Sequence, residues 1–150
     1  MISVQTADFN LNDEYLKLTL DNSKDGAVVT FVGLVRDYNQ GNQVTGLTLE
    51  HYPGMTEKAL VEIVDKAKAR WQLGRVRIIH RVGELHLSDQ IVFVGVSSQH
   101  RVEAFEACQF IMDYLKNDAP FWKKEATTEG SRWVEAENKD VEAQKKWLKS

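Results

Sequence analysis

The sequence predicts an α+β fold in which strand pairs alternate with single helices. Three observations lead to this prediction. Residues 26–37 form a run rich in β-branched side chains after a polar turn, which is typical of a strand. Residues 56–71 carry apolar side chains at helical spacing, and residues 100–117 carry a wider apolar face that indicates a deeply packed helix. The 150 residues, 43% of them hydrophobic, suffice for a self-sufficient core, so we expect a single domain over residues 1–150.

The first half of the chain is predicted to place a hairpin after a short strand and a short helix. The helix is opened by Asn12 or Asp13, which are both good N-cap residues. The strand at residues 26–37 should pair with the next strand as a hairpin, because only a short polar segment separates them. The remaining elements expected here are a strand at residues 2–6, the helix at 12–20, a turn or flexible loop at 38–43 and a strand at 44–52.

The second half begins with the helix at residues 56–71, for which Gly74 lies where a terminator belongs. Ser97 or Ser98 can cap the helix at residues 100–117, and Pro120 prevents that helix from continuing. The other predicted elements are strands at 75–85 and 90–98 joined by a turn at 87–89, strands at 121–126 and 132–136 around a turn at 129–130, and a terminal helix at 139–148.

Composition excludes several classes of protein. A net charge of −3 argues against a nonspecific nucleic-acid binder, which needs a broad basic surface. The only cysteine, Cys108, cannot form an intramolecular disulfide. The chain opens without a basic and apolar leader, and its apolar stretches are far shorter than the ~20 residues of a membrane span. We therefore expect a cytoplasmic protein that binds neither membrane nor nucleic acid.

The segment from Ser97 to Arg101 places two potential cations, His100 and Arg101, at the start of a predicted helix. A helix N-terminus has free N–H groups and partial positive charge, so basic side chains are unfavourable there. An anionic ligand would reverse this penalty and accept hydrogen bonds from the same N–H groups. The alternative is that both side chains simply point into solvent.

Lysines flank the predicted bend at Pro120, and Arg36 lies at a strand end beside a glycine-bearing loop. If residues 121–126 form a strand, Lys123 and Lys124 point to opposite faces, so at most one of them joins a pocket easily. For Arg36 and each of these lysines, a solvated side chain on the surface is the simpler interpretation. The residues alone therefore support only a hypothetical anion pocket, made of Arg36, His100, Arg101 and one or more of the lysines 116, 123 and 124.

Other reactive side chains give weaker signals. Cys108 lies on the apolar face of a predicted helix, which favours a buried structural thiol over a nucleophile. His51, His80 and His86 share no metal-ligand spacing, and no paired-carboxylate pattern occurs. We therefore expect neither a metal nor another cofactor.

Four segments, in order, resemble the large, catalytic subunit of molybdopterin synthase, and the likeness covers nearly the whole chain. They are GAVVTFVGLVR at residues 26–36, LEHYPGMTE at 49–57, VFVGVSSQHR at 92–101, and FIMDYLK at 110–116 continuing into APFWKKE at 119–125. The resemblance implies an α/β hammerhead-type fold with an additional antiparallel sheet, and a homodimer within a heterotetramer. Its partner would be a small ubiquitin-like sulfur-carrier subunit whose C-terminal Gly-Gly carries a thiocarboxylate. The implied reaction adds two sulfurs to cyclic pyranopterin monophosphate and yields molybdopterin, a step of molybdenum cofactor biosynthesis.

The resemblance also implies roles for individual residues. Lys116 and Lys123 match two essential lysines, and we expect Lys116 beside the thiocarboxylate and Lys123 in ring opening or proton transfer. Some relatives have a basic residue where this chain has Leu34, so a backbone contact from Leu34 is expected there. The loop at residues 38–43 could order around substrate. The full implied set adds Arg36, Val35, His100, Arg101, Lys124 and Glu125 for substrate binding, and Phe31 and Met112 as pocket lining.

Two other functions stay open at this point. A noncatalytic module could capture an extended tail at a sheet edge, and its binding would survive replacement of Lys116 and Lys123. A phosphate-ester hydrolase or isomerase could use His100 as general base. The sequence also leaves open whether one copy of the chain holds the whole pocket. In the other arrangement, His100 and Arg101 of one copy join Lys116 and Lys123 of another.

Overall fold

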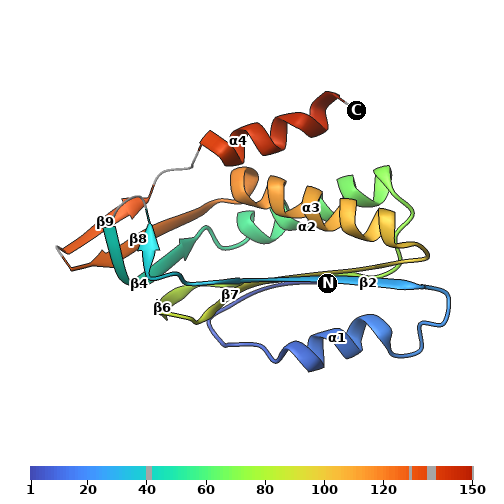
Figure 1. Ribbon diagram of the computed structural model, residues 1–150, viewed down its shortest axis with the longest axis horizontal. Helices are drawn as coiled ribbons and strands as arrows, with labels where there is room; N and C mark the ends of the chain where they lie inside the picture. Colours follow the sequence, from blue (N-terminus) through green and yellow to red (C-terminus); the bar gives the residue numbers. More distant parts are fainter. Residues whose placement is uncertain (40–41, 129, 135–137, 150) are drawn as a thin grey trace.

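The protein forms three layers with a smaller sheet at one end (Figure 1). The computed structural model describes residues 1–39, 42–128, 130–134 and 138–149. Helix α1 (Leu11–Thr19) covers one face of the main sheet, and α2 (Met55–Arg70) and α3 (Arg101–Asp118) cover the other. None of the described helices is long and apolar enough to cross a membrane. The predicted α+β class is confirmed.

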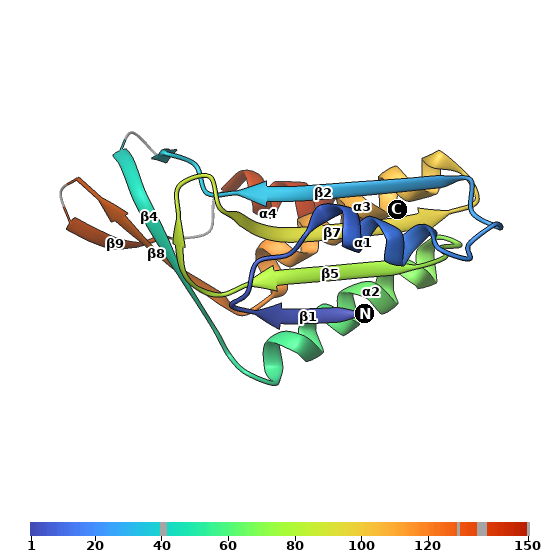
Figure 2. The ribbon, with the colours of Figure 1, turned by 90° about the horizontal axis from the view of Figure 1, so that it is seen from below.

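The main sheet has the strand order β1-β5-β7-β2 (Figure 2). Its strands are β1 (Ile2–Gln5), β5 (Val76–Arg81), β7 (Gln90–Ser98) and β2 (Ala27–Leu34). The β1–β5 pair is parallel, whereas β7 runs antiparallel to both β5 and β2. Strand β7 is buried along most of its length because helices cover both of its faces. Strand β2, at the opposite edge from β1, has a neighbour on one side only among the described strands.

Two apolar clusters hold the helices on the sheet. On the α1 side, Phe9 and Phe93 pack edge to face, with ring centroids 5.8 Å apart, beside Leu18 and Ile79. The larger cluster lies between the sheet and α2 and α3, and includes the fully buried Ile111 and Phe110. Burial of side chains of this size contributes about 1.5–3 kcal/mol each. Cys108 belongs to this cluster, as the sequence predicts for a structural thiol.

The second sheet has the order β3-β4-β8-β9, with β6 paired to β4. Its strands are β3 (Tyr38–Asn39), β4 (Asn42–His51), β6 (Gly83–His86), β8 (Phe121–Thr127) and β9 (Gly130–Val134). A third apolar cluster of Val35, Leu47, Leu49 and Leu85 fills the junction of the two sheets. The additional antiparallel sheet implied by the resemblance is therefore present.

The predicted hairpin of residues 26–37 and 44–52 is wrong. Strand β2 pairs with β7, whereas β4 pairs with β6 and β8. The pairing of β2 becomes irregular between Gly33 and Leu34, and Val35 then turns into the junction core, so the chain leaves one sheet for the other. The predicted strand at 75–85 is likewise divided, because Gly83 has a positive φ of 89° where β6 begins. The predicted turn after it is confirmed, with Ser88 at φ 68°.

Several predicted helix ends are also corrected. Asn10, rather than Asn12 or Asp13, caps α1 and accepts a hydrogen bond from the Asp13 amide. Helix α2 ends before Trp71, three residues short of Gly74. His100 is the N-cap residue of α3, because the Ser97 and Ser98 hydroxyls are bonded elsewhere, to Asp25 and to the Gln72 carbonyl.

The less regular segments agree in part with prediction. The predicted loop at 38–43 contains β3 and the start of β4, while residues 40–41 lie outside the described residues. The strand expected at 132–136 is β9, and residues 129, 135 and 136 of that predicted hairpin lie outside the described residues. The predicted terminal helix is α4 (Asn138–Lys145), continued by the 3-10 helix η1 (Lys146–Lys149).

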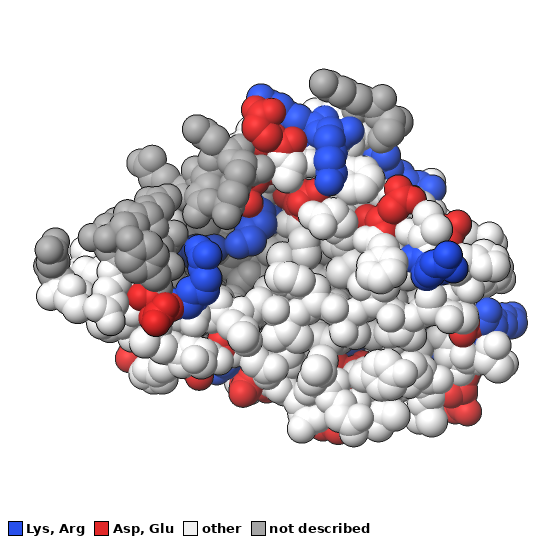
Figure 3. Space-filling model, in the orientation of Figure 1, with Lys and Arg blue, Asp and Glu red and all other residues white. Residues whose placement is uncertain are grey.

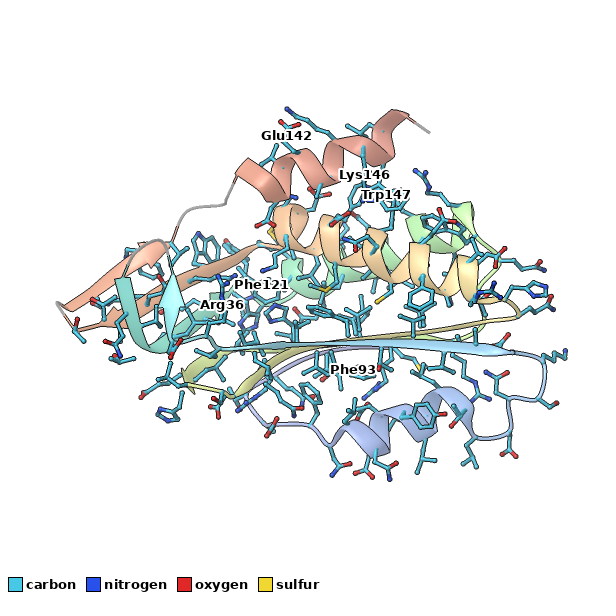
Figure 4. All side chains as sticks on the ribbon, in the orientation of Figure 1. Arg36, Phe93, Phe121, Glu142, Lys146 and Trp147 are labelled. Atoms are coloured by element: carbon cyan, nitrogen blue, oxygen red, sulfur yellow. The ribbon has the colours of Figure 1, made fainter. Side chains whose placement is uncertain are left out.

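Trp147 anchors this terminal segment on α3 (Figure 4). Its indole N–H donates to the buried Asp113 carboxylate at 2.7 Å. Its ring packs edge to face on Trp71 and Phe110, and its carbonyl accepts a hydrogen bond from the Arg70 guanidinium at 2.9 Å. These contacts order the C-terminal segment within a single chain.

We expect Trp147→Ala to lower the free energy of unfolding by about 2–4 kcal/mol, because it removes the ring contacts and the indole N–H bond to Asp113 Oδ2, while Gln109 still donates to Oδ1. Urea denaturation measures this loss. Amide exchange over residues 138–149 should accelerate first, since the docked segment loses its anchor. Trp147→Phe keeps a ring but not the N–H donor. Its free energy of unfolding should therefore lie between those of wild type and Trp147→Ala. Unchanged exchange in Trp147→Ala would show that other contacts hold α4.

Candidate active site

Lys116 and Lys123 meet where α3 ends and β8 begins. Lys116 lies in the last turn of α3, and the chain reverses at Pro120 before entering β8. Side chains of β8 alternate, so that Phe121, Lys123 and Glu125 point inward. The two lysines are close enough to interact electrostatically. Figure 3 shows Lys and Arg side chains gathered where the small sheet meets the helices.

The pKa of Lys123 is lowered to about 8, first by burial and then by the adjacent charge of Lys116. Asp140 of α4 and Glu125 of β8 act in the opposite direction and raise it. A second positive charge beside Lys116 is unfavourable, so Lys123 gives up its proton more readily than an isolated lysine does. Lys123 can therefore exchange a proton near pH 8.

Arg36 lies at the same end of the molecule, just beyond β2 (Figure 4). Val35 beside it is buried, its amide donating to the Asp89 carbonyl and its carbonyl accepting from the Ser88 amide. These bonds fix the strand end and leave Arg36 exposed beside a hollow of about 450 Å³. The hollow is lined by Val35, Arg36, Asp37, Leu87 and Ser88. A guanidinium fixed in this way suits a phosphate, which it can bind through two parallel hydrogen bonds.

Met112 is buried one helical turn before Lys116, on the same side of α3. Glu125 is also buried, on the same face of β8 as Lys123. Lys124, in contrast, is exposed on the outer face of β8, where its amine lies 5.7 Å from the centre of the Trp133 ring. The prediction that Lys123 and Lys124 point to opposite faces is therefore confirmed.

His100 and Arg101 lie at the other end of α3. Fifteen residues separate Arg101 from Lys116, which at 1.5 Å per residue is about 22 Å along the helix. Both residues are exposed, and the His100 side chain makes no capping hydrogen bond. One chain therefore does not bring His100 and Arg101 to Arg36 and the lysines, and the pocket inferred from the residues is divided into two halves.

Phe31 and Leu34 are both exposed along β2, at the edge that pairs with no other described strand. Sequence reasoning also missed two members of the lysine site, His80 and Asp140, which interact with Lys123 electrostatically. Neither carries a motif, and only the packing of β5 and α4 around β8 brings them to the site. Cys108 does not contribute, since burial raises the pKa of its thiol to about 11.

The α+β fold with two sheets, together with a cationic site made of the exposed Lys116 and the half-buried Lys123, fits the class of enzyme subunits that bind an anionic substrate. Residues 4–118 match the family model described as MoaE protein. The chain is 64% identical over 139 residues to the molybdopterin synthase catalytic subunit of Escherichia coli, covering 93% of this chain and 92% of that one. A MoaE protein from Burkholderia ambifaria superposes with a TM-score of 0.84 at 51% identity, over 99% of this chain and 97% of that one. Molybdopterin synthase from Staphylococcus aureus gives 0.82 at 33% identity, over 89% and 96%.

The chain belongs to the MoaE protein family. This membership confirms the predicted role as a sulfur-transferring enzyme of molybdenum cofactor biosynthesis. It also agrees with the structure, since the superposed relatives share the α+β fold over nearly the whole chain.

We expect Lys116→Met to raise the pKa of Lys123 above its value of about 8, because the substitution removes a neighbouring positive charge. The pKa should stay below that of a free lysine, since burial continues to lower it. A ¹³C NMR titration of labelled lysine side chains measures the change, with Lys123→Arg used to assign the signal. The exposed Lys68 offers a matched control, and Lys68→Met should leave the titration unchanged. An unmoved Lys123 midpoint in Lys116→Met would refute the coupling.

Proposed function

We propose that the paired lysines of this chain bind and activate the thiocarboxylated Gly-Gly end of a small ubiquitin-like subunit, and that its sulfur is transferred to cyclic pyranopterin monophosphate. The observation that carries this proposal is the meeting of Lys116 and Lys123 where α3 ends and β8 begins, with the pKa of Lys123 lowered to about 8. The family membership supplies the reaction, and the pair supplies groups that suit it. A lone buried thiol suits a cytoplasmic enzyme, which is the compartment we propose.

Each sulfur transfer forms a bond between the thiocarboxylate sulfur and a substrate carbon, while a carbon–oxygen bond at that carbon breaks and its oxygen stays on the opened cyclic phosphate or leaves as water. Water then cleaves the acyl–sulfur bond, so that sulfur stays on the substrate and the tail leaves as a carboxylate. Both anionic sulfur and the oxyanion formed during hydrolysis are stabilised by a fixed cation, which is the role we assign to Lys116. Lys123, neutral in part near pH 8, accepts or returns the protons that ring opening and hydrolysis move. Arg36 is assigned to the phosphate.

The missing half of the pocket is supplied, in this proposal, by a second copy of the chain. Strand β2 presents an open edge, and Ala27 at its start lies opposite Ser98 while Leu34 at its end lies opposite Gln90. Antiparallel pairing of β2 with its copy about a twofold axis would set the Ala27 end of one copy beside the Leu34 end of the other. His100 and Arg101 of one copy would thereby reach the Arg36 end of its partner.

Exposed apolar side chains support the proposal that this face of the molecule contacts a second copy. They are Phe31 and Leu34 of β2 and Val102 and Phe105 of α3, which are 40%, 53%, 55% and 61% exposed. Arg101, Phe105, Met112 and Lys116 recur at intervals of four, seven and four residues, so they share one side of α3. A twofold contact along this side would cover the apolar residues and bring Arg101 of one copy toward Lys116 of the other. We therefore propose a homodimer with two composite sites.

A conversion assay tests the reaction. It combines this protein, the thiocarboxylated small subunit and cyclic pyranopterin monophosphate, and reads molybdopterin as its fluorescent oxidised derivative. Lys116→Ala and Lys123→Ala should each lower the rate roughly a hundredfold or more, whereas the exposed Lys68→Ala should not. Wild-type rates in Lys116→Ala would overturn its assignment. A folded complex that binds the small subunit and yields no product would be a binding module instead.

Subunit mixing tests the composite site. Arg101→Ala and Lys116→Ala should each be inactive alone, but unfolding and refolding them together should restore about a quarter of the wild-type activity. Random mixing makes half of the dimers hybrid, and each hybrid holds one site with both residues intact. Mixing Lys116→Ala with Lys123→Ala is the matched control and should restore nothing, because both residues belong to the same half. If the first mixture also stays inactive, each site lies within one chain.

A further inference from the structure

A network of hydrogen bonds surrounds the junction between β7 and α3, just before His100. Its centre is the side chain of Ser97, which is polar and yet 0% exposed. The Ser97 hydroxyl donates to the Asp25 carboxylate at 2.8 Å and accepts from the Arg75 amide at 2.8 Å. The side-chain amide of Asn22 donates to the same Asp25 oxygen at 2.8 Å. A buried hydroxyl that is bonded both as donor and as acceptor holds its surroundings in one arrangement.

The backbone around Ser97 is fixed from two sides. On one side its carbonyl oxygen accepts a hydrogen bond from the Gly74 amide at 2.8 Å. On the other side the Gly26 amide donates to the Ser98 carbonyl at 3.1 Å. A Cβ atom at Gly26 would lie only 2.7 Å from the Gln99 carbonyl oxygen, so this close approach requires a glycine. The loop before β2 is therefore in direct contact with the residue that precedes the N-cap of α3.

This junction determines where the first residues of α3 lie. His100 is the N-cap residue and Arg101 begins the helix, and both side chains are exposed. The His100 side chain makes no capping hydrogen bond, so the junction and the helix together set the position of its backbone. In the proposed dimer, the start of β2 lies beside the Arg36 end of the partner. The loop that carries Asp25 directly precedes β2 and so supports the half of the pocket that reaches this partner.

We propose that Asp25 is a positioning residue for the reaction proposed above. Through Ser97 and the backbone of the junction, it holds the first residues of α3 where their side chains can reach the pocket of a second copy. A carboxylate suits this role, because one of its oxygens accepts from both Asn22 and Ser97 and so ties the loop before β2 to the end of β7. A displacement of about 1 Å in a binding group can lower a rate about a hundredfold. The catalytic consequence rests on the proposed function, whereas the support of the junction is a property of one chain.

Three substitutions test this role. Asp25→Ala removes both accepted hydrogen bonds and should raise the KM for the pterin substrate roughly tenfold or more, because the start of α3 is displaced. Asp25→Asn keeps an oxygen that can accept both bonds and should stay close to wild type. Gly26→Ala forces the Gln99 carbonyl to move and should resemble Asp25→Ala. Lys24→Ala, at an exposed position of the same loop, is the matched control and should change nothing.

Subunit mixing separates positioning from a general loss of stability. Asp25→Ala refolded with Lys116→Ala should reach about a quarter of the wild-type activity, since each hybrid dimer has one site with both halves intact. Refolded with Arg101→Ala it should gain none, because both substitutions damage the same half. A chain that is merely unstable supplies neither half. Recovery with Arg101→Ala would overturn the proposal, as would no recovery with Lys116→Ala while the Arg101→Ala and Lys116→Ala pair recovers.

Amide hydrogen exchange in the full-length protein without substrate tests the junction apart from the reaction. The amides of Gly26 and Gly74 donate to carbonyls of the junction and should exchange roughly tenfold faster in Asp25→Ala. The amide of Ile111, in the main core, should be unaffected. Unchanged exchange at both glycines would refute the support that Asp25 gives to the junction. If the Arg101→Ala and Lys116→Ala pair fails to recover, the composite site is wrong and the catalytic role of Asp25 falls with it, while faster exchange still identifies the network.

Discussion

The proposed chemistry of the lysine site depends on one electrostatic constraint: the positive charge of Lys116 disfavours a second positive charge on the adjacent Lys123. Burial and this neighbour together lower the pKa of Lys123 to about 8. Near pH 8, Lys123 is therefore partly a free amine and partly a cation. Thiocarboxylate chemistry needs both, since anionic sulfur requires a cation and acyl–sulfur hydrolysis requires proton transfer.

The fold imposes this pairing on side chains that would otherwise separate. Lys116 is held by α3, whose adjacent Leu115 and nearby Ile111 are buried in the main core. The chain then reverses at Pro120, and the register of β8 with β4 places Lys123 opposite Leu49. Neither α3 nor β8 can move without exposing apolar surface. Burial of that surface therefore offsets the electrostatic cost of placing the two lysines side by side. Asp140 and Glu125 relieve part of that cost without removing the charge.

Sequence alone could reach the local features of the site but not its assembly. Period-two alternation correctly separated Lys123 from Lys124, because strand geometry makes that a property of neighbouring residues. The same alternation could not tell which strand β2 pairs with, and the predicted hairpin failed because the turn of Val35 into the junction core is a tertiary event. Helix length already implies that Arg101 and Lys116 lie far apart, which favours the two-copy arrangement among the two that the sequence left open. His80 gave no signal, since its surroundings come from β4, β8 and α3.

The separation along α3 is the reason for proposing that one chain holds only part of the pocket. Each copy has basic residues at both ends of the helix, and the β2 edge between them pairs with no other described strand of the same chain. Unpaired edges and exposed apolar side chains are unfavourable in isolation, and a twofold pairing along β2 would satisfy both. The same operation would join the two cationic ends into composite pockets, at which an anionic substrate offsets the accumulated charge. Assembly and substrate binding would then be linked, because the pocket that needs the anion exists only where two copies meet.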